Sequence, residues 1–261
     1  MARPEAGHAK NVSNYDELIT SVIGYGAIYN PSKSSLIDLP ALQTLQPLVY
    51  DSASTVNRLA GVFNSARAAR KTAFTPLSKL ITTIINVEQT CNASKQIDEN
   101  IKSLVRKMRG MHKKMNKSIA PVEAPSSITG ATTTTSTPSI TTTKRTISSS
   151  QVGYNTLLDT FDKLIKMLII IPEYQPNEAP ITTASLSTLY HELLALNASV
   201  VSAHVDLSNA KIARFNICYK PTTGMVDRTV DVKKYVKAIF GASSAEYKQI
   251  SKLNFRNYPL F

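Results

Sequence analysis

The sequence predicts an all-α protein: a tandem duplication of an up-and-down helical bundle of about four helices, each copy with one long helix. Three observations support this fold class. Apolar residues recur at helical spacings of three and four. The chain also matches itself at a constant offset, and a Thr/Ser-rich segment separates the two matching parts. A chain of 261 residues is long enough for two domains that each bury a core.

The internal match lies mainly in one ungapped stretch, in which residues 42–70 align with residues 186–214. Tyr29-Asn30-Pro31 also resembles Tyr174-Gln175-Pro176 after one inserted residue, and Lys95-Gln96-Ile97 resembles Lys248-Gln249-Ile250 after a gap. These matches keep one order along the chain, which indicates a duplication. The ungapped pairs are Leu42 with Leu186, Leu45 with Leu189, Val49 with Leu193, Val56 with Val200, Leu59 with Ala203, Phe63 with Leu207, Ala66 with Ala210 and Arg70 with Arg214.

The duplication sets the expected boundaries. We expect a disordered N-terminus at residues 1–12, a first bundle at 13–118, a flexible linker at 119–151 and a second bundle at 152–256. Within the linker, residues 129–150 are dominated by Thr and Ser without apolar periodicity, so they cannot bury a core. A mucin-like stalk has the same composition, but it would require secretion.

One long helix is expected in each copy. Between Leu186 and Ala210 the apolar residues alternate spacings of three and four, which places them on one face of a helix. No Pro or Gly interrupts residues 183–217, and the first-copy counterpart spans about 40–73. At 1.5 Å per residue, such a helix is about 50 Å long.

Shorter amphipathic segments flank each long helix. Residues 157–168 form a stripe before Pro172, and residues 18–28 are the weaker equivalent, with a local break at Gly24-Tyr25-Gly26. Pro76 suits the first turn of the next helix, because its missing N–H would be unpaired there anyway.

The end of the second copy carries two helix-boundary signals. Gly241 follows the apolar stripe of Val232, Val236 and Ile239 and is a good helix-ending residue. Ser243 and Glu246 have the spacing of a capping box, in which the hydroxyl of Ser243 accepts the N–H of Glu246.

Composition limits the partners and the compartment. Thirty Lys and Arg against 18 Asp and Glu give a formal charge of +12, which favours acidic partners such as nucleic acid but is also common on generic basic surfaces. The two cysteines, Cys91 and Cys218, form no framework and are expected to be reduced. The N-terminal residues contain no apolar signal core, and the most apolar run, residues 167–172, is too short to span a membrane. We therefore expect a cytoplasmic protein.

The tail resembles the ending of a group of uncharacterised bacterial all-helical proteins. Residues 232–250 fit their pattern V-K-x-Y-V-K-x-x-F-G-x-x-S-x-x-Y-K-Q-I, and the rest of the chain fits only in outline. The resemblance implies an all-helical fold, and no function is transferable from that group.

Motifs for catalysis and metal binding are missing from the sequence. The four histidines, at positions 8, 112, 191 and 204, form no His-Glu-x-x-His motif, and no two of them are spaced four apart on one helical face. Gly24-Tyr25-Gly26 lacks the strand and the third glycine of a nucleotide-binding fold. Acidic residues are thinly spread, so a carboxylate pair would have to be assembled by the fold. We therefore expect no enzyme, no cofactor and no metal.

Two groups of basic residues are the candidate sites. Seven basic residues and no acid lie in residues 101–117, where a helix face could contact phosphates; a solvated helix end leading into the linker is the alternative. Four further basic residues recur near the ends of the long helices, where the helix dipole favours positive charge, so a structural role is expected over an anion site. The possible anion or nucleic-acid contacts are Lys102, Arg106, Arg109, Lys113 and Lys117, and the repeat-equivalent positions are Arg67, Arg70, Lys211 and Arg214.

The resulting functional hypothesis is a non-enzymatic helical scaffold or protein-interaction protein, with a protein partner or self-association. The alternative is a sequence-independent nucleic-acid-associated protein that uses the basic stretch 102–117. A membrane-acting helical protein is a weaker third class, because only the short apolar run at residues 167–172 favours it.

Overall fold

A computed structural model describes residues 4–32, 35–91, 94–109 and 153–259 of the chain. These residues form helices and no strand, so the predicted all-α class is confirmed. The chain divides into two compact units: a first unit of Met1–Thr72 with Ala198–Phe261, and a second unit of Ala73–Asn197.

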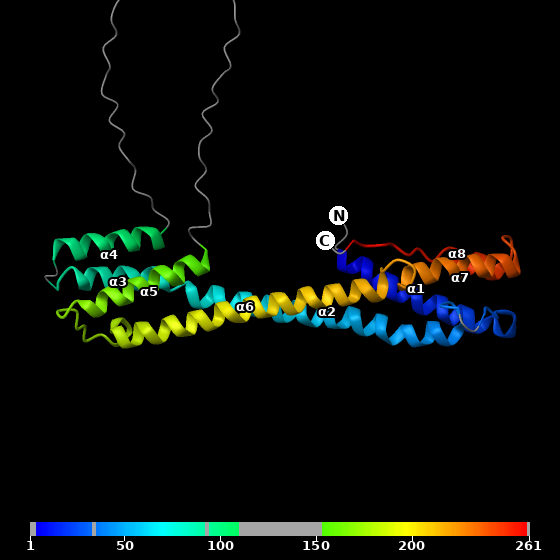
Figure 1. The fold of residues 1–261 in the computed structure, drawn as a ribbon, viewed down its shortest axis with the longest axis horizontal. Helices are drawn as coiled ribbons and strands as arrows, with labels where there is room; N and C mark the ends of the chain where they lie inside the picture. Colours follow the sequence, from blue (N-terminus) through cyan, green and yellow to red (C-terminus); the bar gives the residue numbers. More distant parts are fainter. Residues whose placement is uncertain (1–3, 33–34, 92–93, 110–152, 260–261) are drawn as a thin grey trace, which may run out of the picture. The chain divides into compact units, whose positions relative to one another are not determined.

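The helices follow one another with short connections in the described parts of the chain (Figure 1). Two 3₁₀ turns, η1 and η3, precede the two long helices. The elements are α1 (Pro4–Gly24), η1 (Gly26–Ile28), α2 (Leu39–Phe74), α3 (Leu77–Glu88), α4 (Lys95–Met108), α5 (Tyr154–Ile170), η3 (Ala179–Ile181), α6 (Thr183–Cys218), α7 (Met225–Phe240) and α8 (Ala245–Ser251).

The long helices α2 and α6 begin and end at the same offset along the chain. Each has 36 residues, and both their first residues (39 and 183) and their last residues (74 and 218) are 144 apart. The expected spans of 40–73 and 183–217 are therefore correct to within one residue at each end. Pro47 lies inside α2, where it has no N–H to donate to the carbonyl of Gln43.

The approach to each long helix repeats the same hydrogen bonds. The hydroxyl of Tyr29 donates to the carbonyl of Ile37 at 2.6 Å, and the hydroxyl of Tyr174 donates to the carbonyl of Ile181 at 2.9 Å. Each acceptor lies two residues before its helix.

The side-chain oxygens that cap the two long helices also correspond. Asp38 Oδ1 accepts the N–H of Ala41 at 2.9 Å, and Thr182 Oγ1 accepts the N–H of Ser185 at 3.2 Å. Such bonds satisfy amide groups that have no partner within the helix.

In the first unit, α1 packs against α7 and α8, which also contact each other (Figure 1). Buried apolar residues come from α1, the start of α2, α7 and the chain after α7. They include Tyr15, Leu18, Leu42, Val232 and Val236.

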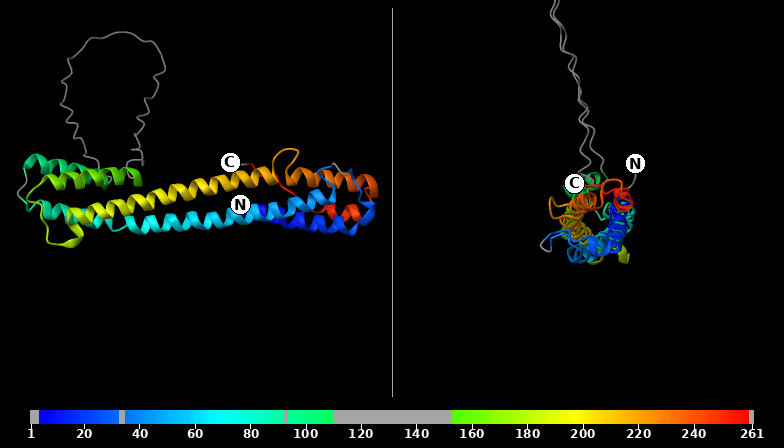
Figure 2. Two further views of the ribbon diagram at one scale, coloured as in Figure 1. Left: turned by 60° about the horizontal axis from the view of Figure 1, so that its bottom comes forward. Right: turned by 90° about the vertical axis from the view of Figure 1, so that its right-hand side faces the viewer.

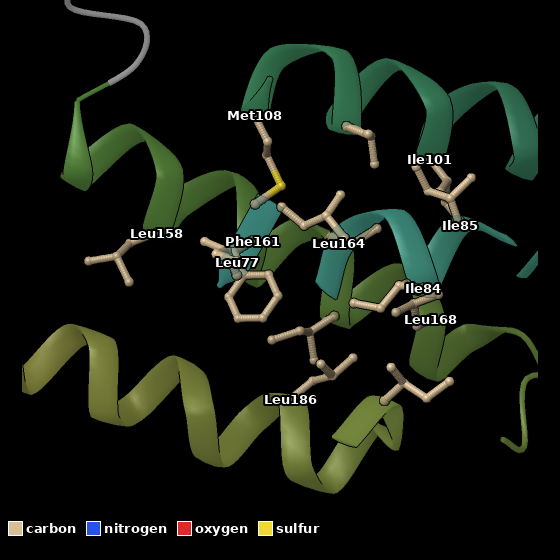
Figure 3. Close-up of a cluster of buried hydrophobic side chains, with 14 of the residues drawn as sticks. Leu77, Ile84, Ile85, Ile101, Met108, Leu158, Phe161, Leu164, Leu168 and Leu186 are labelled. Atoms are coloured by element: carbon tan, nitrogen blue, oxygen red, sulfur yellow. The ribbon is translucent and has the colours of Figure 1, made fainter. Parts of the chain in front are cut away.

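In the second unit, α4 packs on both α3 and α5 (Figure 2). Figure 3 shows side chains from these helices and from the start of α6 pointing toward one another. The central side chains of this hydrophobic cluster are fully buried: Ile84, Ile101, Phe161, Leu164 and Leu186 are each 0% exposed.

The two units cut across the predicted boundaries. Sequence analysis placed one bundle in residues 13–118 and the other in 152–256, whereas each unit draws residues from both of these halves. The first unit joins the beginning of the first half to the end of the second, and the second unit joins the end of the first half to the beginning of the second. The physical reason is that neither half completes a core alone: buried residues of α1 pack with those of α7, and buried residues of α4 pack with those of α5.

Two local expectations were wrong. Residues 4–12, expected to be disordered, belong to α1, because His8 and Asn11 are held by residues near the C-terminus. The helix cap at α8 is formed by Ser244, whose hydroxyl accepts the N–H of Tyr247 at 3.0 Å, and not by Ser243. In contrast, α7 ends before Gly241, as expected, and α1 ends at Gly24, where a local break within residues 18–28 was expected. The predicted linker, residues 119–151, lies outside the described residues.

Candidate functional site

Helix α6 has two apolar faces. One is the predicted stripe, in which Leu186, Leu193 and Val200 are buried. The second face is exposed. In the first unit its apolar residues follow a helical spacing of three and four, with the half-buried Ser208 at the position between the last two of them. We call this face the α6 surface; it consists of Ala198, Val201, Val205 and Ile212.

The α6 surface exposes three large apolar side chains on one helix. Val201 is 56% exposed and Val205 is 48% exposed. Single exposed apolar residues are normal, but a row along one helix is typical of an interaction site. The residues that flank the row are mostly neutral: Ser202, His204, Asn209 and Lys211.

Two carboxyl groups lie at the corner between α3 and α4 of the second unit: that of Glu88, which is buried, and that of Asp98, which is half-buried. Glu88 is the last residue of α3 and is 0% exposed. Both of its carboxyl oxygens and the Oδ1 of Asp98 are buried without a hydrogen-bond partner. Burial, followed by the neighbouring Asp98, raises the pKa of Glu88 to about 7.

The surroundings of Glu88 contain one cation and two weak acids. The charge of Lys102 on α4 lowers the pKa of Glu88, opposing the effect of burial. Burial raises the pKa of Cys91, and burial raises the pKa of Tyr174 to about 12. Neither the thiol nor the phenol therefore ionises near neutral pH.

The first unit buries polar groups that are, in contrast, well partnered. The hydroxyl of Tyr219 lies 2.5 Å from Nδ1 of His8 and accepts the side-chain amide of Asn11 at 3.3 Å. That amide also donates to the carbonyl of Arg256, and the Oδ1 of Asn11 accepts the N–H of Arg256. This network joins α1 to the end of the chain, which is a structural role.

The predicted basic stretch is only partly described. Lys102, Arg106 and Arg109 lie on α4 or directly after it, whereas Lys113 and Lys117 lie outside the described residues. Arg106 is exposed, but Arg109 donates to the hydroxyl of Thr82 on α3 at 2.7 Å. The predicted outer face is thus divided, since Lys102 is half-buried near Glu88 and Arg109 bonds within the unit.

The repeat-equivalent basic residues differ in their surroundings. Arg70 and Arg214 each lie four residues before the end of their long helix, and Arg214 is 6% exposed whereas Arg70 is half-buried. Arg67 lies over the ring of Phe63, 5.5 Å from its centre, and Lys211 is half-buried. All four residues belong to the first unit.

The described residues contain neither a metal-binding cluster nor a membrane-spanning helix. Among the described residues, no three or more His, Cys, Asp or Glu side chains are placed to hold a metal ion. Within the same part of the chain, no helix combines the length and the apolar character that crossing a membrane requires.

The comparisons with known proteins gave no relatives. No family model, no curated protein and no solved structure matches this chain.

Sequence analysis missed both main features, although each has a signal in the sequence. Glu88 continues the apolar stripe of Leu77, Ile81 and Ile84 at helical spacing, so a carboxyl group on the buried face could have been recognised. The α6 surface is a second apolar register on one helix, and a helix that is apolar on two sides has more than one surface to cover.

Proposed function

We propose that this chain is a non-enzymatic helical scaffold that acts in the cytoplasm and self-associates through the α6 surface. The observation that carries the proposal is the exposed row of Ala198, Val201, Val205 and Ile212 on one face of α6. Two such rows with a three-and-four spacing can pack as a short coiled-coil seam. Both cysteines are unbridged, which supports a reducing compartment.

The chemistry beside this surface favours a second copy of the chain over an acidic partner. Lys211 is the one cation among the four flanking residues, so two copies facing each other meet little like-charge repulsion. An acidic partner would gain little there, because the flanks do not concentrate positive charge. The row spans 15 residues, or about 21 Å of helix, so we expect a weak, concentration-dependent dimer.

The non-enzymatic part of the proposal rests on the carboxyl pair. Catalytic acids and bases must reach a substrate, and Glu88 is 0% exposed. A carboxyl group that is closed off from solvent is suited to a structural or regulatory role.

Sedimentation velocity over a range of protein concentrations tests self-association. The wild-type chain should shift from monomer toward dimer, and a Val201→Glu, Val205→Glu double variant should remain monomeric because it places like charges in the seam. Val62→Glu is the matched control, since Val62 is a 47% exposed valine on α2. A wild-type chain that stays monomeric at every concentration, or a double variant that still dimerises, contradicts the proposal.

We also propose that the two halves of the chain arose by duplication. Four correspondences support it: the bounds of α2 and α6, their side-chain caps, the two tyrosine hydrogen bonds before them, and the buried residues of α1 and α5. In the last case, the buried Tyr15, Leu18, Ile19 and Val22 have the same spacing as the buried Phe161, Leu164, Ile165 and Leu168.

Nucleic-acid binding through residues 102–117 is the second candidate function. The exposed side chains of Arg106 and Lys107 at the end of α4 favour it. Phosphate contacts release counterions, so the affinity for random duplex DNA should fall with salt with a log–log slope of about −0.9 per contact. An Arg106→Gln, Lys107→Gln variant should reduce that slope, and a wild-type chain that does not bind duplex DNA at low salt removes this candidate.

A further inference from the structure

The carboxyl pair of the second unit lies on α3 and α4 and is not part of the α6 surface. Three of its oxygens, Oε1 and Oε2 of Glu88 and Oδ1 of Asp98, are buried and accept no hydrogen bond. An ionised carboxylate in that position has lost its water without replacement, which costs several kcal/mol. Two such charges side by side are less favourable still.

One proton resolves both problems. A protonated carboxyl group donates an O–H to its ionised neighbour, so the pair holds a single charge and gains a hydrogen bond. The dipoles of the two helices determine which of the two carboxyl groups holds that proton. Glu88 ends α3, where the helix dipole disfavours negative charge, whereas Asp98 lies in the first turn of α4, where the dipole favours it. Glu88 is therefore the protonated member.

We propose that Glu88 and Asp98 share one proton, and that loss of this proton as the pH rises loosens the packing of α4 on α3, which makes the corner a proton-sensitive switch. The pair joins two helices that contact each other directly. Once both carboxyl groups are charged, their repulsion and their need for water act on the same contact.

The other groups that face the pair do not account for a transition near neutral pH. Burial raises the pKa of Cys91 from an ordinary value of 9.0, and Tyr174 ionises only at about 12. Lys102 carries a positive charge that favours ionised Glu88 and moderates the effect. The negative charge of Glu173 further raises the pKa of Cys91, and that of Glu178 further raises the pKa of Tyr174. Burial, followed by the neighbouring Asp98, raises the pKa of Glu88 from an ordinary value of 4.5 to about 7, within the range that a cell experiences.

The direction of the pH effect follows from this raised pKa. Between about 4.5 and about 7 the folded chain holds a proton on Glu88 that the unfolded chain has lost. The stabilisation is therefore complete below about pH 4.5, declines as the pH rises through about 7, and is absent above that. The second unit should be tightest in mild acid.

A carbon-13 NMR titration of the glutamate side chains of the full-length chain tests the shared proton. The Glu88 carboxyl carbon, assigned from its absence in Glu88→Gln, should titrate with a midpoint near 7. Asp98→Asn should lower that midpoint, because it removes the neighbouring charge. Glu99→Gln is the matched control: Glu99 is exposed and adjacent to Asp98, so the midpoint should stay where it is. A wild-type midpoint near the ordinary value of 4.5, or one that Asp98→Asn does not move, overturns the shared proton.

Hydrogen exchange of the α4 amides, corrected for intrinsic rates, tests the switch. Between about pH 5 and about pH 8, wild-type protection should fall by at least about tenfold, because the loss of one proton is linked to the opening. Glu88→Gln keeps a donor toward Asp98 without a charge, so its protection should stay constant over that range. A wild-type chain whose α4 protection does not change, or a variant that retains the wild-type pH dependence, overturns the switch. If Glu88→Gln fails to fold, the wild-type exchange and the Asp98→Asn titration still decide the outcome.

Discussion

Helices α3 in the second unit and α7 in the first bury different groups at the same distance from their first residues. Glu88 lies eleven residues after the first residue of α3 (77 to 88), and Val236 lies eleven residues after the first residue of α7 (225 to 236). Both side chains are 0% exposed. The buried side chain at this distance along the helix is therefore apolar in the first unit and ionisable in the second.

The difference shows that burying a polar group has two distinct consequences for the structure of this chain. In the first unit, Asn11 and Tyr219 are buried with partners, and the result is a fixed link between α1 and the C-terminal residues. In the second unit, Glu88 is buried beside another carboxyl group, that of Asp98, and the two can form a hydrogen bond only when one of them is protonated, so the result is a dependence on pH. Satisfied polar groups fix a structure, whereas unsatisfied ones make it conditional.

The largest expected effect is on the shared core of the second unit. Phe161→Ala removes a fully buried ring of α5 and should lower the free energy of unfolding by about 3–5 kcal/mol, the range for such cavities. Denaturant unfolding measures this change. Exchange of the α3 and α4 amides should rise first, because those helices share the core with α5. A loss below about 1 kcal/mol would mean that this core does not hold the unit together.

Exchanging the residues at the corresponding position tests the comparison directly. Glu88→Val should stabilise the chain at about pH 8 by up to about 3 kcal/mol, the equivalent of raising a pKa from 4.5 to about 7. It should have little benefit at about pH 5, where Glu88 is protonated.

The reciprocal variant, Val236→Glu, should destabilise the chain, and more so at high pH, because it buries a carboxyl group among apolar neighbours. Unfolding curves at both pH values give both answers. If Glu88→Val changes the free energy of unfolding equally at the two pH values, the cost of burying Glu88 does not depend on its ionisation, which contradicts the comparison.

The smallest effect concerns the cap of α8. Ser244→Ala removes the hydroxyl that accepts the N–H of Tyr247 and should cost about 1 kcal/mol. Ser243→Ala should change the free energy of unfolding by much less, although the sequence pattern favoured Ser243. The two variants measured together distinguish the observed cap from the predicted one.

The extent of sequence-based prediction depends on whether a feature is local. The long helices were located to within one residue, because three-and-four periodicity and the absence of Pro and Gly act within α6 itself, and α2 was placed by its alignment with α6. Residues 4–12 were misassigned because their helix is held by Tyr219, Arg256 and Tyr258, which are more than 200 residues away. Pairing of the halves was missed for the same reason, since periodicity does not say which amphipathic helices meet.

The candidate site shows the same division. The identity of Glu88 as a buried-face residue is contained in the stripe of α3, but its proximity to Asp98 depends on how α4 folds back on α3. Basic residues were easy to find in the sequence, yet Arg109 is engaged with Thr82 through tertiary packing that the sequence does not reveal. Chemistry-bearing residue types are visible in a sequence, whereas their partners are set by the fold.

The central claim is that each compact unit is assembled from both halves of the chain, and one cleavage experiment tests it. A protease recognition sequence placed within residues 129–150, the predicted linker, allows the purified folded chain to be cut into its two halves. Because α1 packs with α7 and α8, and α4 with α5, the two fragments should elute together on size exclusion and keep the helical signal of the uncut chain. Fragments that separate under native conditions, each retaining its own helical fold, would contradict the account and restore two independent bundles at residues 13–118 and 152–256.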